Sequence, residues 1–304
     1  LTAQAYTLLS RLGRFHPEAR ALLQKVDCVQ NVVYREVGAC SLSLDVYRPV
    51  DQQGPLPVVL YVHGGGFFCL SKDTHWLMGL AFARRGYVVF NIDYRLAPEH
   101  PFPAAMEDVC AAWCWVVREA RHFGGDPERI VLAGESAGAN LVTGLTLATA
   151  YRREEAFAKA VWETAHTPKA VVPACGIYQL SGEDRFRDID VDRFTRNRLT
   201  EVPYYYLPQG DLGASVDFAD PVCLLERGEK PERPLPPFFL PVGDLDPLWE
   251  DSQRMERALL ALETPAEART YIGQHHAFHA LWWKEAARQA WADQLAFIEE
   301  HRTA

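Results

Sequence analysis

The sequence predicts an α/β fold in which a mostly parallel β-sheet is covered by helices on both faces. Short apolar runs alternate with segments of helical periodicity, and most of these runs are apolar almost without interruption. A continuous apolar run is typical of a strand buried on both faces, as in parallel sheets. The expected strands are residues 56–62, 86–92, 129–134, 169–175, 238–242 and 268–272.

Between these strands, apolar side chains recur at helical spacing. One such segment runs from Met106 to Ala120, and another contains Trp291, Leu295 and Ile298. Open sheets built from alternating strands and helices carry their sites at the carboxyl ends of the strands. We therefore expect functional side chains directly after strands.

Two regions interrupt the alternation. Residues 1–45 begin with a helical pattern, and residues 177–230 are rich in charge, Pro and Tyr. A chain of 304 residues has room for two domains, but one core with a cap fits this pattern better. We predict an N-terminal cap segment at 1–45, a core at 46–304 and a cap insertion at about 177–230. The tyrosines at 204–206 either line a pocket or pack the cap on the core.

Composition limits the classes of partner. Apolar residues make up 48% of the chain and charged residues 23%, as in a globular protein with a sizeable core. The formal net charge of -9 and the lack of a Lys/Arg tract argue against nucleic acid and anionic membranes. The sequence shows neither a leader pattern nor an apolar run of about 18 residues. We therefore expect a cytoplasmic protein with a small-molecule partner and no stable membrane insertion.

The seven cysteines have no framework spacing, which favours reduced thiols. Cys110 and Cys114 lie one helical turn apart, but no further Cys or His pair at ligand spacing accompanies them. We therefore predict neither a metal nor an organic cofactor.

The segment 129–140 is an apolar strand that runs into Gly-x-Ser-x-Gly and then a small-residue helix. A serine on so tight a turn projects its hydroxyl above the sheet, and Gly134 and Gly138 are small because strand and helix nearly collide. Ser136 is therefore the candidate nucleophile. In isolation this pattern is more often an ordinary loop, but the flanking strand and helix favour the nucleophile.

A serine nucleophile needs donors for the oxyanion, and three glycines follow the strand 56–62. Without side chains, the backbone amides of Gly64 and Gly65 can approach a developing negative charge, together with the amide of Ala137. A Gly-rich loop can also cradle phosphate, but no Gly-Lys-Ser/Thr follows here.

The serine also needs a base and a carboxylate that orients it. Asp244 and Asp246 both follow the strand 238–242, and Asp246 is preferred. Three histidines follow the last strand; His276 is preferred as the base, with His275 and His279 interpreted as structural or exposed. The chain order Ser, Asp, His is the one that α/β hydrolases require.

These motifs resemble the hormone-sensitive-lipase-like carboxylesterases of the α/β-hydrolase superfamily, including bacterial carboxylesterases and arylacetamide deacetylases. The resemblance spans about residues 45–300 and rests on HGGGF at 63–67, DYRLAPEHPFPAA at 93–105, GESAG at 134–138, DPL at 246–248 and HAF at 276–278. It implies an α/β-hydrolase fold with a helical cap and a scaffold role for 93–105. It also implies the nucleophile Ser136, the acid Asp246, the base His276, and oxyanion donors at Gly64, Gly65 and Ala137.

The chain departs from the family pattern at two positions. Ala277 stands where Gly is usual, and Glu135 stands where Asp is common. Ala tolerates a positive φ poorly, so Ala277 is expected to adjust the histidine loop. One interpretation of Glu135 is a contact with the loop that carries the base.

The resemblance implies a serine hydrolase that acts on short- to medium-chain acyl or aryl esters through an acyl-enzyme. An amide or formamide hydrolase with the same triad is the first alternative, and a non-catalytic small-molecule receptor is a remote one. An unperturbed imidazole base predicts a rate that falls as the pH drops through about 6.5. The oligomeric state is left open, with a homodimer as one expectation.

Overall fold

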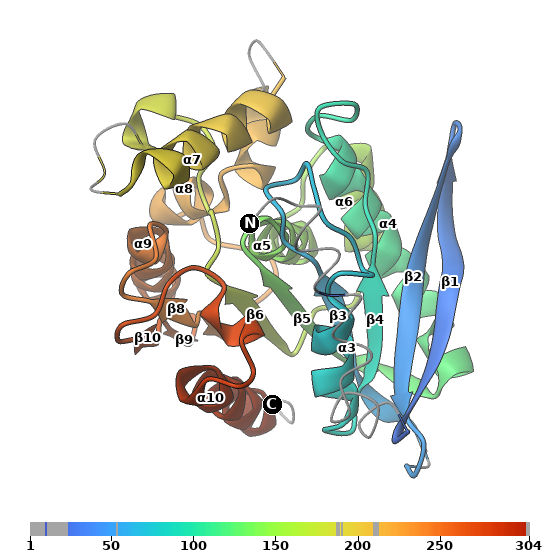
Figure 1. Cartoon of the computed structure of the whole chain (residues 1–304). Coiled ribbons are helices and arrows are strands. Elements are labelled where there is room, and N and C mark those ends of the chain that lie inside the picture. Colours follow the sequence, from blue (N-terminus) through green and yellow to red (C-terminus); the bar gives the residue numbers. More distant parts are fainter. Residues whose placement is uncertain are drawn as a thin grey trace.

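The computed structural model describes residues 10, 24–52, 54–186, 189, 191–208 and 213–301. In this part of the chain, eight strands form one sheet in the order β1-β2-β4-β3-β5-β6-β7-β9 (Figure 1). The strands of this sheet are β1 (Val26–Val37), β2 (Cys40–Pro49), β3 (Leu56–Val62), β4 (Val88–Ile92), β5 (Gly125–Glu135), β6 (Ala170–Ala174), β7 (Phe238–Phe239) and β9 (Ala266–Glu267). A separate parallel pair joins β8 (Val242–Gly243) to β10 (Thr270–Tyr271).

The predicted parallel sheet is confirmed. From β4 to β9, each strand pairs with its neighbour in parallel, whereas β1 and β2 are antiparallel. The expected strand 238–242 is divided into β7 and β8. Pro241 stands between them, and because proline has no N–H to give to a ladder, it interrupts the strand. The expected strand 268–272 is likewise shorter and contains only β10.

The prediction that residues 1–45 form a cap segment is wrong for residues 26–45. These residues form β1 and part of β2, an antiparallel hairpin at one edge of the sheet (Figure 1). The hairpin turns at Gly38, whose φ of 57° suits glycine. The helical pattern therefore ends before β1 begins at Val26. Apart from Ser10, residues 1–23 of that prediction lie outside the described residues.

Helices cover both faces of the sheet, and β3 shows why. Its alternate residues point to opposite faces: Val58, Leu60 and Val62 belong to one apolar cluster, whereas Val59 and Tyr61 belong to another. The first cluster includes residues of α4 (Ala104–Glu119), α5 (Ala137–Ala150), α6 (Ala156–Glu163), α8 (Pro221–Glu226) and α9 (Trp249–Ala261). The second includes residues of α3 (Trp76–Ala83) and α10 (Glu285–His301).

Residues 177–230, the predicted cap insertion, are mostly helical where they are described. They contain η2 (Glu183–Phe186), α7 (Arg193–Tyr206), η3 (Gly213–Phe218) and α8. The buried ring of Tyr206 stacks on Phe67, with 3.8 Å between centroids, so α7 packs on the loop after β3. Tyr204 is 65% exposed. Of the three tyrosines, Tyr206 therefore packs this segment on the core. The division of the chain into a core and a cap stays a prediction.

None of the helices among the described residues combines the length and the apolar character needed to cross a bilayer.

Candidate active site

Ser136 stands at the junction of β5 and α5 with φ 53° and ψ -115°. Such a conformation is unusual for a residue other than glycine, and it persists only where its surroundings enforce it. A Cβ on Gly138 would lie 2.1 Å from the carbonyl oxygen of Val62, and one on Gly134 would lie 2.7 Å from Gly138. The predicted collision of strand and helix is therefore real. The backbone of Ser136 has the geometry of a nucleophile elbow.

The amides of the glycine loop are oriented by hydrogen bonds to the preceding carbonyls. The Tyr94 hydroxyl donates to the carbonyl oxygen of His63 at 3.0 Å, and Nδ1 of His63 donates to the carbonyl oxygen of Gly64 at 2.7 Å. In a trans peptide, the C=O and the following N–H point in opposite directions. Fixing these two carbonyls therefore turns the N–H groups of Gly64 and Gly65 away from Tyr94 and His63.

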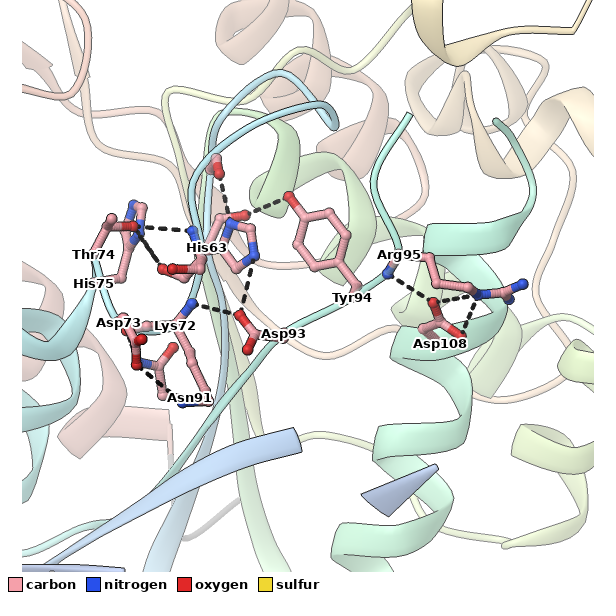
Figure 2. A network of polar contacts seen from close by, with 12 residues as sticks. His63, Lys72, Asp73, Thr74, His75, Asn91, Asp93, Tyr94, Arg95 and Asp108 are labelled. Carbon is pink, nitrogen blue, oxygen red and sulfur yellow. Dashed lines mark hydrogen bonds and ion pairs between the residues drawn. The ribbon is translucent and has the colours of Figure 1, made fainter. Parts of the chain in front are cut away.

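His63 acts here as a neutral donor. Burial, together with the nearby His75, lowers the pKa of His63 to about 3. The ring of Tyr94 stacks on His63 at 4.2 Å with an interplanar angle of 13°, and Figure 2 shows the two rings beside each other. The glycine loop, residues 63–67, which is called the oxyanion loop here for its predicted role, therefore packs against Tyr94 of the DYR segment.

The expected scaffold at 93–105 makes further contacts around this loop. The backbone N–H of Lys72 donates to Asp93 at 2.8 Å, and Nε of Arg95 donates to Asp108 at the same distance (Figure 2). The amide of Ala97 donates to the carbonyl oxygen of Phe67 at 2.9 Å. These bonds join the segment to the oxyanion loop and to α4.

The structure brings Asp246 and His276 together. Nδ1 of His276 lies 2.9 Å from Oδ2 and 3.1 Å from Oδ1 of Asp246, whose side chain is fully buried. Leu248 donates its backbone N–H to the same carboxylate at 2.9 Å. Asp244 instead accepts from the amide of Gly273 at 2.6 Å. The geometry thus favours Asp246 as the carboxylate partner of the imidazole and gives Asp244 a loop-stabilising contact.

The side chain of His276 is 36% exposed, so its imidazole is accessible to solvent, whereas the carboxylate of Asp246 is not. Burial alone would lower the pKa of His276, but the charge and hydrogen bond of Asp246, helped by Cys175, outweigh it and raise the pKa well above 6.5. Ala277 follows with φ 57°, so the residue that replaces the usual glycine does adopt the left-handed conformation. His275 is exposed and His279 is buried.

Ser136 and His276 belong to segments that meet at the carboxyl ends of β5 and β6. The N–H of Ser136 donates to the carbonyl oxygen of Ala174 at 2.9 Å, and the next residue, Cys175, has a thiol that contacts His276. Ala277 packs against Ala174 and Cys175. A hydrogen bond between the Ser136 hydroxyl and the imidazole stays a prediction, as do the catalytic roles of all six predicted site residues.

Glu135 does contact the loop that carries the base. Its carboxylate lies 2.9 Å from Nε2 of His279 and 2.7 Å from Nε2 of His75. Burial alone would raise the pKa of Glu135, but the two histidines hold it well below its usual value. The partner His75 was missed from the sequence. The signal was available, because an acid inside an apolar strand-to-helix junction needs a hydrogen-bonding or cationic partner.

Cys175 was also missed as a neighbour of the candidate base. One donor atom each from Cys175, Asp246 and His276 lies within 4.8 Å of the other two. Thiolate, carboxylate and imidazole are ligands that Zn²⁺ and related soft cations accept. Two of these donors are the proposed acid and base, so a cation held there would remove the base.

We therefore expect Cd²⁺ to inhibit ester hydrolysis and Cys175→Ala to be at least about tenfold less sensitive, because it lacks one ligand. The measurement is the inhibitory Cd²⁺ concentration for a fixed ester. Cys223→Ala, which removes a partly buried thiol away from His276, is the control and should behave like the wild type. Equal sensitivity of the Cys175 variant would contradict this prediction.

A side chain at Gly65 should disable the oxyanion loop. Gly65 has φ +117°, and a Cβ there would lie 2.0 Å from the carbonyl oxygen of Cys69. Gly65→Ala is expected to lower kcat by about 10²-fold or more and to lower Tm. Gly228→Ala is the matched control, since Gly228 also has a positive φ but no atom within 4 Å of the added Cβ. A Gly65→Ala variant with normal kcat would show that this loop does not stabilise the oxyanion.

Comparisons with known proteins agree with this geometry. A family model described as the alpha/beta hydrolase fold matches residues 59–280. A carboxylesterase of Mycobacterium tuberculosis, NlhH, is 31% identical over 234 residues, which are 76% of this chain and 69% of that protein. The versiconal hemiacetal acetate esterase of Dothistroma septosporum is 27% identical over 82% of this chain and 74% of its own length.

Solved structures show the same fold. A bacterial heroin esterase superposes with a TM-score of 0.76 at 24% identity, covering 94% of this chain and 91% of that one. The metagenomic carboxylesterase EstE1 superposes with a TM-score of 0.74 at 25% identity, covering 99% and 98%. The chain therefore belongs to the α/β-hydrolase fold family, among the hormone-sensitive-lipase-like carboxylesterases.

Proposed function

We propose that the protein hydrolyses short- to medium-chain acyl or aryl esters through an acyl-enzyme on Ser136. The observation that carries this proposal is the hydrogen bond between the buried Asp246 and the partly exposed His276, on a loop that packs beside the elbow of Ser136. The named esterases among the relatives support the ester as the bond that is cleaved.

In the first half-reaction, the Ser136 hydroxyl attacks the ester carbonyl while Nε2 of His276 takes its proton. The carbonyl oxygen becomes an oxyanion, which the amides of Gly64, Gly65 and Ala137 stabilise. The amide of Ala137 is available because it begins α5, where the first N–H groups have no partner within the helix. Collapse of this intermediate expels the alcohol, which takes the proton from His276.

In the second half-reaction, water attacks the acyl-enzyme and His276 accepts its proton. The same amides stabilise the second oxyanion, and the returned proton restores the Ser136 hydroxyl as the acid leaves. Asp246 keeps the imidazole in the tautomer that carries a proton on Nδ1 and stabilises the imidazolium that forms in both steps.

The acyl-size preference is supported by α7. A Cβ on Gly66 would lie 3.2 Å from Val202 of α7 and 2.9 Å from the ring of Phe68. Val202 and Phe68 therefore lie beside the glycine loop, and we infer that they limit the space for the acyl group.

The test is a chain-length series of p-nitrophenyl esters together with the anilide of the preferred acyl group. We expect kcat/KM to be highest for acyl chains of roughly two to eight carbons and to be lower for the anilide, because an amine leaves less readily than an alcohol. A faster anilide would favour the amide or formamide alternative. Failure of a fluorophosphonate to add to Ser136, measured by intact mass, would favour the receptor alternative. A cytoplasmic location and a homodimer stay predictions.

A further inference from the structure

Glu135, the residue before the proposed nucleophile, has a buried carboxylate between two histidines. Its Oε1 lies 2.7 Å from Nε2 of His75, and its Oε2 lies 2.9 Å from Nε2 of His279. None of the three residues is more than 5% exposed. A buried carboxylate is strongly destabilising without partners. Oε1 of Glu135 is hydrogen-bonded to His75, whereas Oε2 lies at ion-pair distance from His279 but outside hydrogen-bond geometry, and the two imidazoles come from distant segments.

Each histidine belongs to a segment that carries another part of the proposed site. His279 lies three residues after His276, and its carbonyl oxygen accepts a hydrogen bond from Trp291 of α10 at 3.1 Å. The histidine loop is therefore fixed to α10 through the backbone of His279 and to β5 through its side chain. Losing the side-chain contact would remove the link between this loop and the residue next to Ser136, while the contacts of Ala277 and Phe278 and the bond to α10 remain.

His75 lies at the other end of the segment that begins with the oxyanion glycines. Its Nδ1 is 2.9 Å from the hydroxyl of Thr74, which in turn donates to the carbonyl oxygen of Ser71 at 2.6 Å. Glu135 also lies close to Gly64. A Cβ on Gly64 would lie 3.0 Å from the carbonyl oxygen of Glu135 and 3.1 Å from its Cγ.

We propose that Glu135 and His279 are positioning residues that hold the loop of His276 in register with Ser136, while His75 fixes the oxyanion segment to the same carboxylate. This inference rests on the proposed function. The nucleophile, the base and the oxyanion donors come from three segments far apart in the chain, and Glu135 contacts all three. The carboxylate of Glu135, directly next to Ser136 on β5, sets the relative positions of these three segments through short contacts. This role requires no contact with the substrate.

The length of the side chain matters for this role. Glu135 spans two imidazoles with separate oxygens, and its Cγ already lies against Gly64. An aspartate would withdraw its carboxylate by one methylene, so it could not keep both distances without moving a loop. The longer side chain of glutamate is therefore matched to the distance between His75 and His279.

The test compares His279→Leu with His279→Gln. Leucine removes the partner of Oε2, whereas the amide of glutamine places an N–H close to the position of Nε2. We expect kcat for a short acyl ester to fall by at least about tenfold in His279→Leu, with KM changed by less than about threefold, and to recover largely in His279→Gln. Glu135→Asp should show the same kcat-selective loss.

His166→Leu is the matched control. His166 contacts Glu128 at 3.1 Å through Nε2, so it is also a histidine paired with a glutamate, but at the surface of the molecule. We expect this variant to keep the wild-type kcat. Thermal unfolding of each variant shows whether it is folded at the assay temperature.

A second readout does not depend on turnover. In the Ser136→Ala protein, the Nδ1 proton of His276, bound to Asp246, should give a downfield proton NMR signal. We expect that signal to broaden or disappear on adding His279→Leu and to return with His279→Gln. If wild-type protein hydrolyses no ester, the proposed function fails, whereas this signal still tests the positioning role. Unchanged kcat and an unchanged signal in folded His279→Leu would overturn the inference, as would equal losses in the leucine and glutamine variants.

Discussion

Ser136→Ala is expected to lower kcat for a short p-nitrophenyl ester by about 10⁴-fold or more, equivalent to about 5.5 kcal/mol of transition-state stabilisation. The alanine keeps the backbone of the elbow but has no oxygen to form the acyl-enzyme. The residual rate comes from substrate binding and the oxyanion donors, which remain in place. The measurement is kcat at saturating ester, together with the mass of the protein after fluorophosphonate treatment.

The control for this variant is Ser41→Ala, because Ser41 lies exposed on β2, far along the sheet from β5. Wild type and Ser41→Ala should both gain the mass of one adduct, and Ser136→Ala should gain none. Hydrolysis at the wild-type rate by Ser136→Ala would show that another group attacks the ester.

Asp246→Asn is the second large effect. The carboxylate of Asp246 accepts from Nδ1 of His276 and stabilises the imidazolium, and an amide does neither well. We expect kcat to fall by about 10⁴-fold. Asp244→Asn is the control, because its amide oxygen can still accept from Gly273. A greater loss of kcat in Asp244→Asn than in Asp246→Asn would indicate that Asp244 is the carboxylate that orients the base.

The dependence of wild-type activity on pH tests the pairing of Asp246 with His276 separately. Protonated His276 cannot accept a proton, so activity falls as the pH drops through its pKa. The raised pKa of His276 therefore moves this fall to a pH above 6.5, higher than an unperturbed imidazole predicts. In Asp246→Asn the effect of burial, which lowers the pKa of His276, and the raising effect of Cys175 remain, while the charge of Asp246 is gone. The residual activity should therefore persist to lower pH than in the wild type.

The prediction of the fold succeeded where the pattern was local. The strand 56–62 is continuous and apolar, and it appears with the same bounds as β3. The N-terminal hairpin was missed because β1 lies at the edge of the sheet, where half-exposed residues give little apolar signal. Pro241 divides one expected strand into β7 and β8, because proline has no N–H for the ladder and the apolar pattern alone does not mark that break.

The sequence by itself determined the elbow around Ser136, the glycine loop and the order of serine, aspartate and histidine along the chain. These features depend on steric limits between near neighbours, such as the lack of room for a Cβ at Gly138. Only the tertiary structure decided that Asp246 rather than Asp244 binds His276, and that Glu135 lies between His75 and His279. Those partners are about 30 to 144 residues apart, and their contacts depend on strand register and loop packing, which no local pattern specifies.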